Sequence, residues 1–531
     1  LNINKKAQYD IEIKGDFSKL KSTIAIKNSE EKEDLTVKLN GNRINLYFKN
    51  EKGQVIKLTG TVGDDKSRIW FGKTLEENNW VNWGAIRKKL EENEVEIDSM
   101  QVEKKKKVPT PTFPQMAYGF DSIPEKGETI VFRNATIWSN EKEGILKNYD
   151  LVIHEGKILM LDYKINLEVM FPDLAKNIRE IDLSGKHLTT GIIDEHSHIA
   201  ISRGVNESGQ AVTAEVSIAD VVNSDDINIY RQLAGGVTTS QLLHGSANPI
   251  GGQSAIIKLR WGKTPEKMKV EGADGFIKFA LGENVKQSNW GDRRTVRFPQ
   301  TRMGVEQVYY DAFYRARDYN ANWALYNAKS KREKKNSFAP RFDIELDVLS
   351  QILDSQRFVT CHSYIQSEIN MLIHVADSMG FRINTFTHIL EGYKVADKLR
   401  EHGAAGSTFS DWWAYKFEVN DAIPYNGAIM HKNGVLTGFN SDDAEMGRRL
   451  NQEAAKAVKY GGVSEVEAWK FVTLNPAIML HLDDRLGSIK KGKDADLVIW
   501  SQNPLSIYAV VEQTYIDGIK YFDINEKERL E

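Results

Sequence analysis

Hydrophobic and polar residues alternate along the first hundred positions in the manner of β-strands. Residues 35–39 (LTVKL) and 44–48 (INLYF) alternate, and residues 40–42 (NGN) between them form a turn sequence. Two alternating runs around an Asn-Gly turn predict a β-hairpin, because the turn reverses the chain and the alternation gives each strand one buried face. We therefore expect an N-terminal, mostly-β domain over residues 1–107, with a core that contains Trp70, Trp80 and Trp83.

A charged and proline-rich segment follows this domain. Residues 104–114 (KKKKVPTPTFP) hold four lysines and then three prolines. Like charges repel one another and proline lacks a backbone donor, so this composition disfavours a regular sheet. A solvated linker over residues 108–128 explains the segment better than a nucleic-acid contact does.

Short strand patterns return on both sides of a long central region. Residues 149–153 (YDLVI) lie before it, and residues 495–500 (ADLVIW) and 519–522 (IKYF) lie after it. Because both flanks have the same β-rich texture, we expect residues 129–189 and 485–531 to form one composite β-sandwich.

The central region alternates short apolar runs with stretches of helical periodicity, which is typical of repeated βα units around a parallel sheet. Eight candidate strands over residues 190–484 predict an α/β fold, a (β/α)₈ TIM barrel with insertions. The candidate strands are Gly191–His198, Val237–Leu243, Ala255–Leu259, Phe276–Leu281, Phe358–His362, Ile383–His388, Gly406–Phe409 and Leu436–Ser441.

Composition narrows the class of protein. The chain has 531 residues, of which 41% are hydrophobic and 27% charged, and 71 bases against 74 acids give a formal net charge of −3. This balance argues against nucleic acid as a partner. No apolar run approaches the roughly 20 residues of a transmembrane segment. Cys361 is the single cysteine, so an internal disulfide is excluded, and we expect it to be a buried packing residue.

Candidate metal ligands fall at the ends of the predicted barrel strands. His196 and His198 close the first strand, and residues two apart on a strand face the same side. Because the carboxyl ends of barrel strands converge on one face, the ligands from later strands would meet this pair. These are Lys278 within the fourth strand, His362 at the end of the fifth, His388 at the end of the sixth and Asp442 after the eighth.

The residue types fit a particular chemistry. Neutral imidazole and carboxylate are ligands for Zn²⁺, and Mn²⁺ or Fe²⁺ are alternatives. Two such ions need a bridging anion, and a buried, deprotonated Lys278 would supply one after reaction with CO₂ to a carbamate. From the residues alone, an ammonium paired with a nearby acid is the simpler interpretation of Lys278.

These residues resemble motifs of the amidohydrolase superfamily, and the resemblance extends over about residues 129–523. It is carried by GIIDEHSH at 191–198, LAGGVTT at 233–239, GADGFIK at 272–278, VTCHSY at 359–364, NTFTH at 384–388, FNSDD at 439–443 and NPAIMLHLDDRLGSIKKGKDADLVIW at 475–500. The version with a lysine is similar to the branch of imidazolonepropionase-like proteins and Xaa-Pro dipeptidases that have a carboxylated lysine.

The resemblance implies a role for each candidate residue. His196 and His198 would bind the more buried of two divalent ions, and His362 and His388 the second. A carboxylated Lys278 would bridge them. Asp442, preferred to its neighbour Asp443 because Ser-Asp matches the motif, would bind the first ion and move the proton. The implied reaction is attack of a metal-bridging hydroxide on the carbonyl of an amide, peptide or cyclic amide.

Other functions stay open at this point. A catalytically silent binding protein is one alternative, and a heterocycle aminohydrolase is another, although Glu368 lies too far past His362 for the one-metal design of such enzymes. We expect a small-molecule or short-peptide substrate, contacted by His244, Arg293 and Trp412.

The location and assembly of the protein also stay open. The chain does not begin with Met and is interpreted as a processed product or fragment. Residues 244–254 (HGSANPIGGQS) resemble a segment of long exported amidohydrolases. An exported or periplasmic location is therefore the expectation, with the cytoplasm as the alternative, and a homo-oligomer or a larger parent chain is compatible with the sequence.

Overall fold

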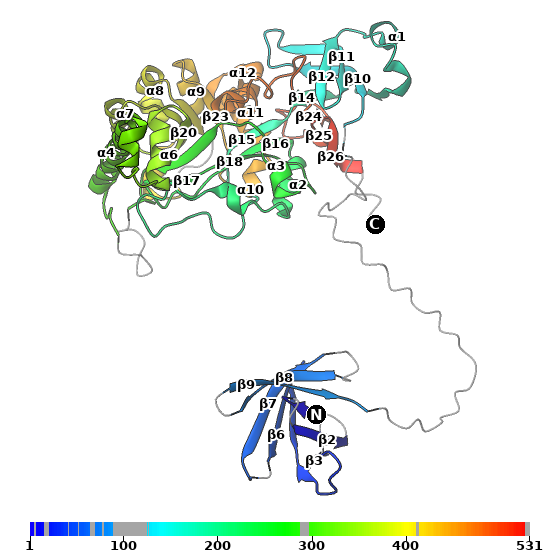
Figure 1. Ribbon diagram of the computed structural model, residues 1–531. Coiled ribbons are helices and arrows are strands. Elements are labelled where there is room, and N and C mark those ends of the chain that lie inside the picture. The colour runs from blue at the N-terminus through cyan, green and yellow to red at the C-terminus, as the bar shows by residue number, and fades with distance from the viewer. Residues whose placement is uncertain are drawn as a thin grey trace, which may run out of the picture. The chain divides into compact units, whose positions relative to one another are not determined.

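The computed structural model divides into two compact units, residues 1–108 and 109–531 (Figure 1). It describes residues 1–4, 7–14, 21–40, 42–50, 52–63, 69–76, 79–88, 125, 127–286, 297–409 and 414–525.

The first unit is one antiparallel sheet that closes on itself. Its strands follow the order β4-β3-β2-β1-β9-β8-β7-β6-β5. The two outermost strands, β4 and β5, are separated in the chain only by Leu35, so the two edges of the sheet meet there. The bounds are β1 Asn2–Ile3, β2 Ala7–Lys14, β3 Lys21–Ile26, β4 Glu33–Asp34, β5 Thr36–Asn40, β6 Arg43–Lys49, β7 Val55–Val62, β8 Ile69–Glu76 and β9 Asn79–Ile86.

The predicted hairpin is confirmed, because β5 and β6 pair with Leu39 opposite Ile44. The prediction for the tryptophans is only partly correct. Trp83 is 2% exposed and lies in the core, whereas Trp80 is 70% exposed. The two residues are three positions apart on β9, so their side chains point to opposite faces of the strand.

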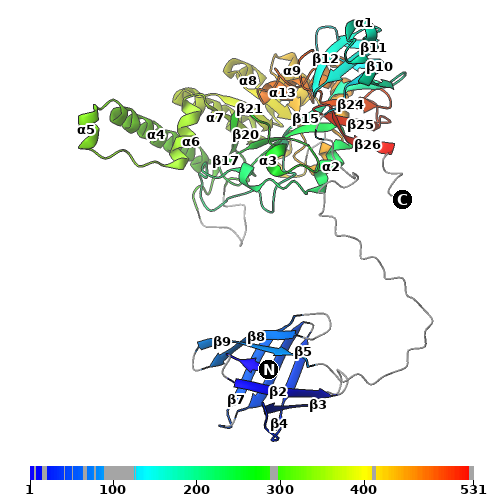
Figure 2. The same ribbon diagram turned by 45° about the vertical axis from the view of Figure 1, so that its right-hand side comes forward.

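The second unit contains a sheet built from both of its ends. Figures 1 and 2 show β10–β12 and β24–β26 together at one side of the barrel. The sheet has the order β12-β11-β10-β14-β24-β25-β26, with β13 beside β10. The strands are β10 Ile130–Trp138, β11 Ile145–His154, β12 Lys157–Asp162, β13 Arg179–Asp182, β14 His187–Thr190, β24 Leu497–Trp500, β25 Val511–Ile516 and β26 Ile519–Asp523.

Parallel strands of the second unit form the TIM-barrel domain. They form one ladder from β15 to β16 and another that runs from β19 to β23. The backbone N–H of Asp442, after β23, donates to the carbonyl of His196 on β15 at 3.1 Å, which brings the last strand back to the first. The strands are β15 Ile192–Ser197, β16 Val237–Leu242, β19 Gly275–Ala280, β20 Arg357–Ser363, β21 Ile383–His388, β22 Ala405–Thr408 and β23 Thr437–Phe439.

The third predicted strand, Ala255–Leu259, runs in the opposite direction to the one expected. It corresponds to β18 (Ala255–Lys258), which pairs antiparallel with β16, and the preceding β17 (Ile250–Gln253) pairs antiparallel with β19. A parallel partner needs a crossover of about a dozen residues or more. Residues 243–254, which connect β16 to its partner β18, contain β17 and no helix, so there is no helical crossover and the chain pairs antiparallel instead.

Helices surround the barrel strands (Figure 1). The largest is α4, of 26 residues. No described helix of the chain combines the length and the apolar character needed to cross a membrane. The helices are α1 Leu167–Met170, α2 Ile227–Leu233, α3 Pro265–Met268, α4 Arg302–Asn327, α5 Lys331–Lys335, α6 Ile344–Leu353, α7 Gln366–Met379, α8 Ala396–His402, α9 Asn426–Lys432, α10 Ala444–Gly447, α11 Leu450–Gly461, α12 Glu465–Lys470 and α13 Leu474–Met479.

A buried group of charges joins the barrel to the sheet. Lys258 of β18 is fully buried, and its Nζ lies 2.8 Å from Asp494, 3.0 Å from Asp496 and 2.6 Å from Asp517. Arg260 pairs with the second oxygen of Asp517 at 2.7 Å. A buried ammonium is tolerated only with such partners, so this contact fixes how the two parts of the unit meet.

Candidate metal-binding active site

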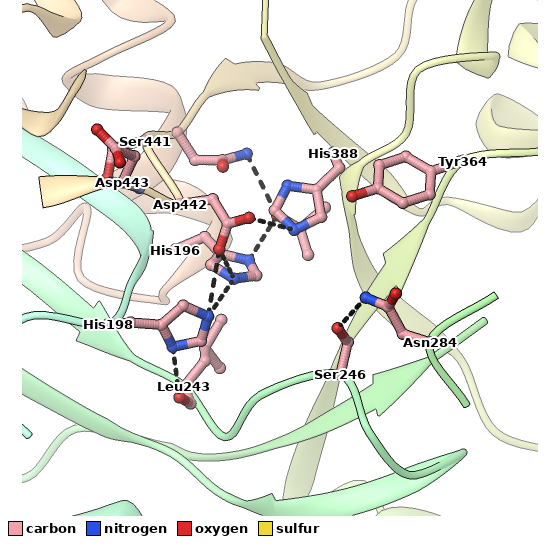
Figure 3. A network of polar contacts seen from close by, with 12 residues as sticks. His196, His198, Leu243, Ser246, Asn284, Tyr364, His388, Ser441, Asp442 and Asp443 are labelled. Carbon is pink, nitrogen blue, oxygen red and sulfur yellow. Dashed lines mark hydrogen bonds and ion pairs between the residues drawn. The ribbon is translucent and has the colours of Figure 1, made fainter. Parts of the chain in front are cut away.

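The six predicted ligands lie together at the carboxyl ends of the barrel strands. His196 belongs to β15, Lys278 to β19, His362 to β20 and His388 to β21, while His198 directly follows β15 and Asp442 lies three residues after the end of β23. Figure 3 shows His196, His198 and His388 around the carboxylate of Asp442. The convergence follows from the parallel arrangement, because each of these strands ends at the same face of the barrel.

Three of these side chains form a nearly equilateral triangle of ligand atoms. Oδ1 of Asp442 lies 3.2 Å from Nε2 of His196 and 3.2 Å from Nε2 of His198. The two Nε2 atoms are 3.3 Å apart. Bonds of about 2.0–2.2 Å to a tetrahedral Zn²⁺ would separate neighbouring ligand atoms by roughly 3.3–3.6 Å. The triangle therefore has the size of one face of such a site.

The other candidate ligands lie next to this triangle. Nζ of Lys278 lies 3.1 Å from Nε2 of His196. Nε2 of His388 lies 3.6 Å from Oδ2 of Asp442, the carboxylate oxygen outside the triangle. The rings of His362 and His388 are 4.8 Å apart between centroids. Asp442 thus directs Oδ1 towards His196 and His198, and Oδ2 towards His388.

Hydrogen bonds on the far side of two rings set which nitrogen faces the site. Nδ1 of His196 lies 2.9 Å from the hydroxyl of Thr387, and Nδ1 of His198 lies 2.9 Å from the carbonyl of Leu243. Because that carbonyl only accepts, His198 carries its proton on Nδ1 and presents a lone pair at Nε2. Nε2 of His362 and both ring nitrogens of His388 are buried and have no hydrogen-bond partner among the described residues. Such buried ring nitrogens without a partner are what a bound metal ion would satisfy.

The charge states also suit a metal. Burial lowers the pKa of His196 to about 3 and holds the pKa of His362 and His388 well below the ordinary value. Burial opposes ionisation of Asp442, but the adjacent His388 and His196 outweigh it and lower its pKa well below the usual range. Burial lowers the pKa of Lys278 to about 8. Neutral imidazoles beside an ionised carboxylate are the protonation states that metal binding requires.

Two candidate ligands have a strained backbone, and a buried carboxylate holds the residue next to one of them. Asp442 has φ +50° and His388 has φ +67°, both in the left-handed region. Asp194 accepts hydrogen bonds from the backbone N–H of Ser441 at 3.0 Å and from its hydroxyl at 2.5 Å. Asp443 instead accepts from two backbone N–H groups at the start of α10. The geometry therefore assigns the capping role to Asp443 and leaves Asp442 facing the histidines.

The residues expected to contact a substrate are less well placed. Nδ1 of His244 lies 2.8 Å from the carbonyl of Gly245, and its Nε2 accepts from the backbone N–H of Glu207 at 2.8 Å. Both ring nitrogens are therefore occupied by the backbone. Arg293 and Trp412 lie outside the described residues, so the structure does not address them.

Several residues that shape the site were not assigned a role from the sequence. Thr387, Asp194 and Tyr364 lie within the quoted motifs NTFTH, GIIDEHSH and VTCHSY, so their closeness to a ligand in sequence was the available signal. Figure 3 shows Tyr364 beside His388, and their rings are stacked at 5.8 Å between centroids. Lys416, whose Nζ lies over the ring of Tyr364 at 4.3 Å, had no motif to mark it.

Comparisons with known proteins agree with this geometry. A sequence model of the amidohydrolase family matches residues 425–520. The amidohydrolase tasK of Hapsidospora irregularis is 29% identical over 435 residues, which are 75% of this chain and 43% of that protein. The chain thus spans less than half the length of this relative. The imidazolonepropionase of Thermoplasma acidophilum is 21% identical over 391 residues, 67% of this chain and 83% of that protein.

A solved structure is similar over the whole of its length. It is the crystal structure of an amidohydrolase from Thermotoga maritima, with 32% sequence identity and a TM-score of 0.66. The match covers 74% of this chain and 100% of the other. With this identity, this coverage and the ligand set at the barrel mouth, the chain belongs to the amidohydrolase family.

Proposed function

We propose that the protein is a metal-dependent hydrolase that cleaves a carbon–nitrogen bond of an amide, a peptide or a cyclic amide. The observation that supports this most directly is the triangle of Asp442 Oδ1 with the Nε2 atoms of His196 and His198, which has the dimensions of a metal site. Two divalent ions, Zn²⁺ first and Mn²⁺ or Fe²⁺ as alternatives, fit the donor set.

The residues divide between the two ions by position. His196, His198 and Oδ1 of Asp442 would hold one ion, and His362 and His388 the other. Lys278 lies in hydrogen-bonding distance of His196, and its buried amine, with a pKa lowered to about 8 by that burial, exists partly in the neutral form that reacts with CO₂. The resulting carbamate would supply a negatively charged bridge between the ions.

Asp442 has the properties of a proton carrier. When bound, the metal ions make water nucleophilic at neutral pH and polarise the carbonyl of the substrate. The carboxylate of Asp442 is ionised and 23% exposed, so it is accessible from the solvent side. It would take the proton of the attacking water and deliver it to the leaving nitrogen as the C–O bond forms and the C–N bond breaks.

The two alternatives have weaker support. An aminohydrolase of the one-metal type needs an acid close to the third histidine, but Glu368 lies in α7 and forms an ion pair with Arg302. A silent binding protein would have no need for six metal-competent side chains in one place. Imidazolonepropionase, named for one relative, opens a cyclic amide and falls within the proposed class.

Turnover of a defined substrate panel tests the proposal. The metal-loaded protein is incubated with dipeptides, N-acylated amino acids and cyclic amides, and the release of amine or the opening of the ring is measured. We expect turnover of at least one class, loss of turnover after chelation and recovery when Zn²⁺ or Mn²⁺ is added back. His196→Asn should retain the fold by circular dichroism and lose metal and activity. Full activity of the chelated protein, or ammonia release from heterocycles alone, would contradict the proposal.

A further inference from the structure

Lys416 lies close to two tyrosine rings at the edge of the site. Nζ of Lys416 is 4.3 Å from the ring centroid of Tyr364 and 5.7 Å from that of Tyr415. The ring of Tyr364 in turn packs against two candidate ligands, with centroids 4.6 Å from His362 and 5.8 Å from His388. The ring of Tyr364 therefore contacts both a positive charge and the candidate histidines of the site.

A positive charge at this position opposes the binding of metal ions when no anion is bound beside it. The ring of Tyr364, over which Lys416 lies, also contacts His362 and His388, so the charge of Lys416 is close to the candidate ligands. A cation near divalent ions repels them, and this repulsion is strong where burial reduces the screening by water. An anionic group of the substrate would instead be attracted both to Lys416 and to the metal ions.

Glu418, the counter-ion of Lys416, also contacts two other groups. Oε1 of Glu418 lies 2.7 Å from Nζ of Lys416, while Oε2 accepts from the backbone N–H of Glu283 at 2.8 Å and lies 3.2 Å from Arg302. The side chain of Glu418 is fully buried, whereas that of Lys416 is 23% exposed. An ammonium has three donors, so Lys416 can bind a further anion from the solvent side without giving up Glu418.

The two tyrosine rings near this ammonium each carry a hydroxyl group. The hydroxyls of Tyr364 and Tyr415 are 2.9 Å apart, and Figure 3 shows the hydroxyl of Tyr364 directed towards the space between His388 and the Ser246–Asn284 pair. Tyr415 is 50% exposed. One of the two hydroxyl protons is used between them, so the ammonium and the remaining hydroxyl proton form the donor set that suits a carboxylate.

We propose that Lys416, with the hydroxyls of Tyr364 and Tyr415, binds a free carboxylate of the substrate. The inference rests on the proposed function and names its substrate class: amides in which a carboxylate lies close to the scissile C–N bond, as in a dipeptide or an N-acylated amino acid. Lys416 is then a specificity residue, and substrates without that charge are poor ones.

Matched pairs of substrates test this proposal. Dipeptides with a free C-terminal carboxylate are compared with the same dipeptides as carboxamides, and kcat and KM are measured for the metal-loaded protein. We expect the wild type to prefer the free acids and Lys416→Met to reduce that preference by about 10- to 100-fold, chiefly through KM, because a charged hydrogen bond is lost. Lys416→Arg should restore part of the preference.

A second lysine provides the control. Lys394 also lies over a tyrosine ring, that of Tyr393 at 5.7 Å, and pairs with Glu391 and Asp421. Lys394→Met removes a comparable ion pair and should leave the acid-to-carboxamide ratio unchanged. If Lys416→Met lowers turnover of acids and carboxamides equally, its role is structural and the proposal is wrong.

Binding of product-like ligands separates the two proposals if no dipeptide is cleaved. Titration calorimetry of the metal-loaded protein compares free amino acids with amino acid amides. Weaker binding of the free acids alone in Lys416→Met supports the carboxylate site even when the proposed hydrolysis fails. Equal binding of acids and amides by the wild type overturns it, whatever the protein hydrolyses.

Discussion

The hydroxyl of Thr387 lies 2.9 Å from Nδ1 of His196. Thr387 precedes His388 on β21, so one strand supplies both a candidate ligand and the group that orients another. The amide of Asn440 contacts the same hydroxyl at 3.2 Å. The hydroxyl oxygen has two lone pairs, so it can accept from Asn440 and from the Nδ1–H of His196 together, which leaves the lone pair of His196 on Nε2, facing the site.

Thr387→Val should therefore weaken metal binding without removing a ligand. Valine keeps the shape of threonine, but it leaves Nδ1 of His196 without its partner, so the ring is free to rotate or change tautomer. Loss of such an orienting group typically costs about 10- to 100-fold in metal affinity. The affinity for Zn²⁺ can be measured by competition with a chromophoric chelator.

Thr408→Val is the control for this substitution. Thr408 is also buried, lies on the neighbouring strand β22 and accepts a hydrogen bond from Asn426 at 2.9 Å. Its removal costs a comparable contact that does not involve a ligand. Equal losses of metal affinity in the two variants would show that packing, rather than the orientation of His196, is responsible.

Lys278→Ala should lose activity and recover part of it in the presence of small carboxylates. If a carbamate on Lys278 bridges two ions, alanine leaves a space at a position that still needs an anion, and formate or acetate can enter it. Intact-mass spectrometry at neutral pH should also show the wild type heavier by one CO₂. An active wild type with an unmodified Lys278 would contradict the carbamate.

Removal of metal should destabilise only the unit that contains the ligands. All six candidate ligands lie within residues 109–531, whereas residues 1–108 have a core of their own. A ligand present at 100 to 1,000 times its Kd stabilises the folded state by about 3–4 kcal/mol. Differential scanning calorimetry with and without chelator should therefore shift one unfolding transition. A shift of both transitions would contradict this expectation.

The convergence of the ligands could be predicted because it depends only on strand direction. His196, Lys278, His362, His388 and Asp442 are far apart in sequence, but parallel barrel strands bring their carboxyl ends to one face. The reversed strand β17–β18 could not be predicted from its apolar pattern, since the alternation of a strand is the same in both directions. The lack of a helix between residues 243 and 254 was the signal that mattered.

Contacts between separate loops could not be predicted from the sequence either. The pairing of Lys416 with the ring of Tyr364 joins a segment after β22 to one after β20, and neither spacing nor composition indicates it. Likewise, the exposure of Trp80 depends on which face of β9 is covered. Residue type predicts which chemistry is available, whereas the packing of loops decides which residues share it.

Lys258→Met should destabilise the second unit, and more so at high pH. In the wild type, burial disfavours ionised Asp494, but Lys258 and Lys157 outweigh burial and lower the pKa of Asp494 to about 2. This depressed pKa stabilises the fold above the carboxyl's ordinary pKa of 3.8 and ceases to do so as the pH falls through 2. Burial raises the pKa of Asp496 to about 6 even beside Lys258. Without the lysine, the buried carboxylates repel one another, which should cost about 3–5 kcal/mol at pH 8. Protonation of Asp496 should make the loss smaller at pH 5.

Urea unfolding at pH 5 and pH 8 measures this difference in the loss of stability. Lys157→Met, at a half-exposed lysine, is the control and should lose about 1 kcal/mol or less. A loss that is independent of pH would mean that Lys258 acts through packing alone.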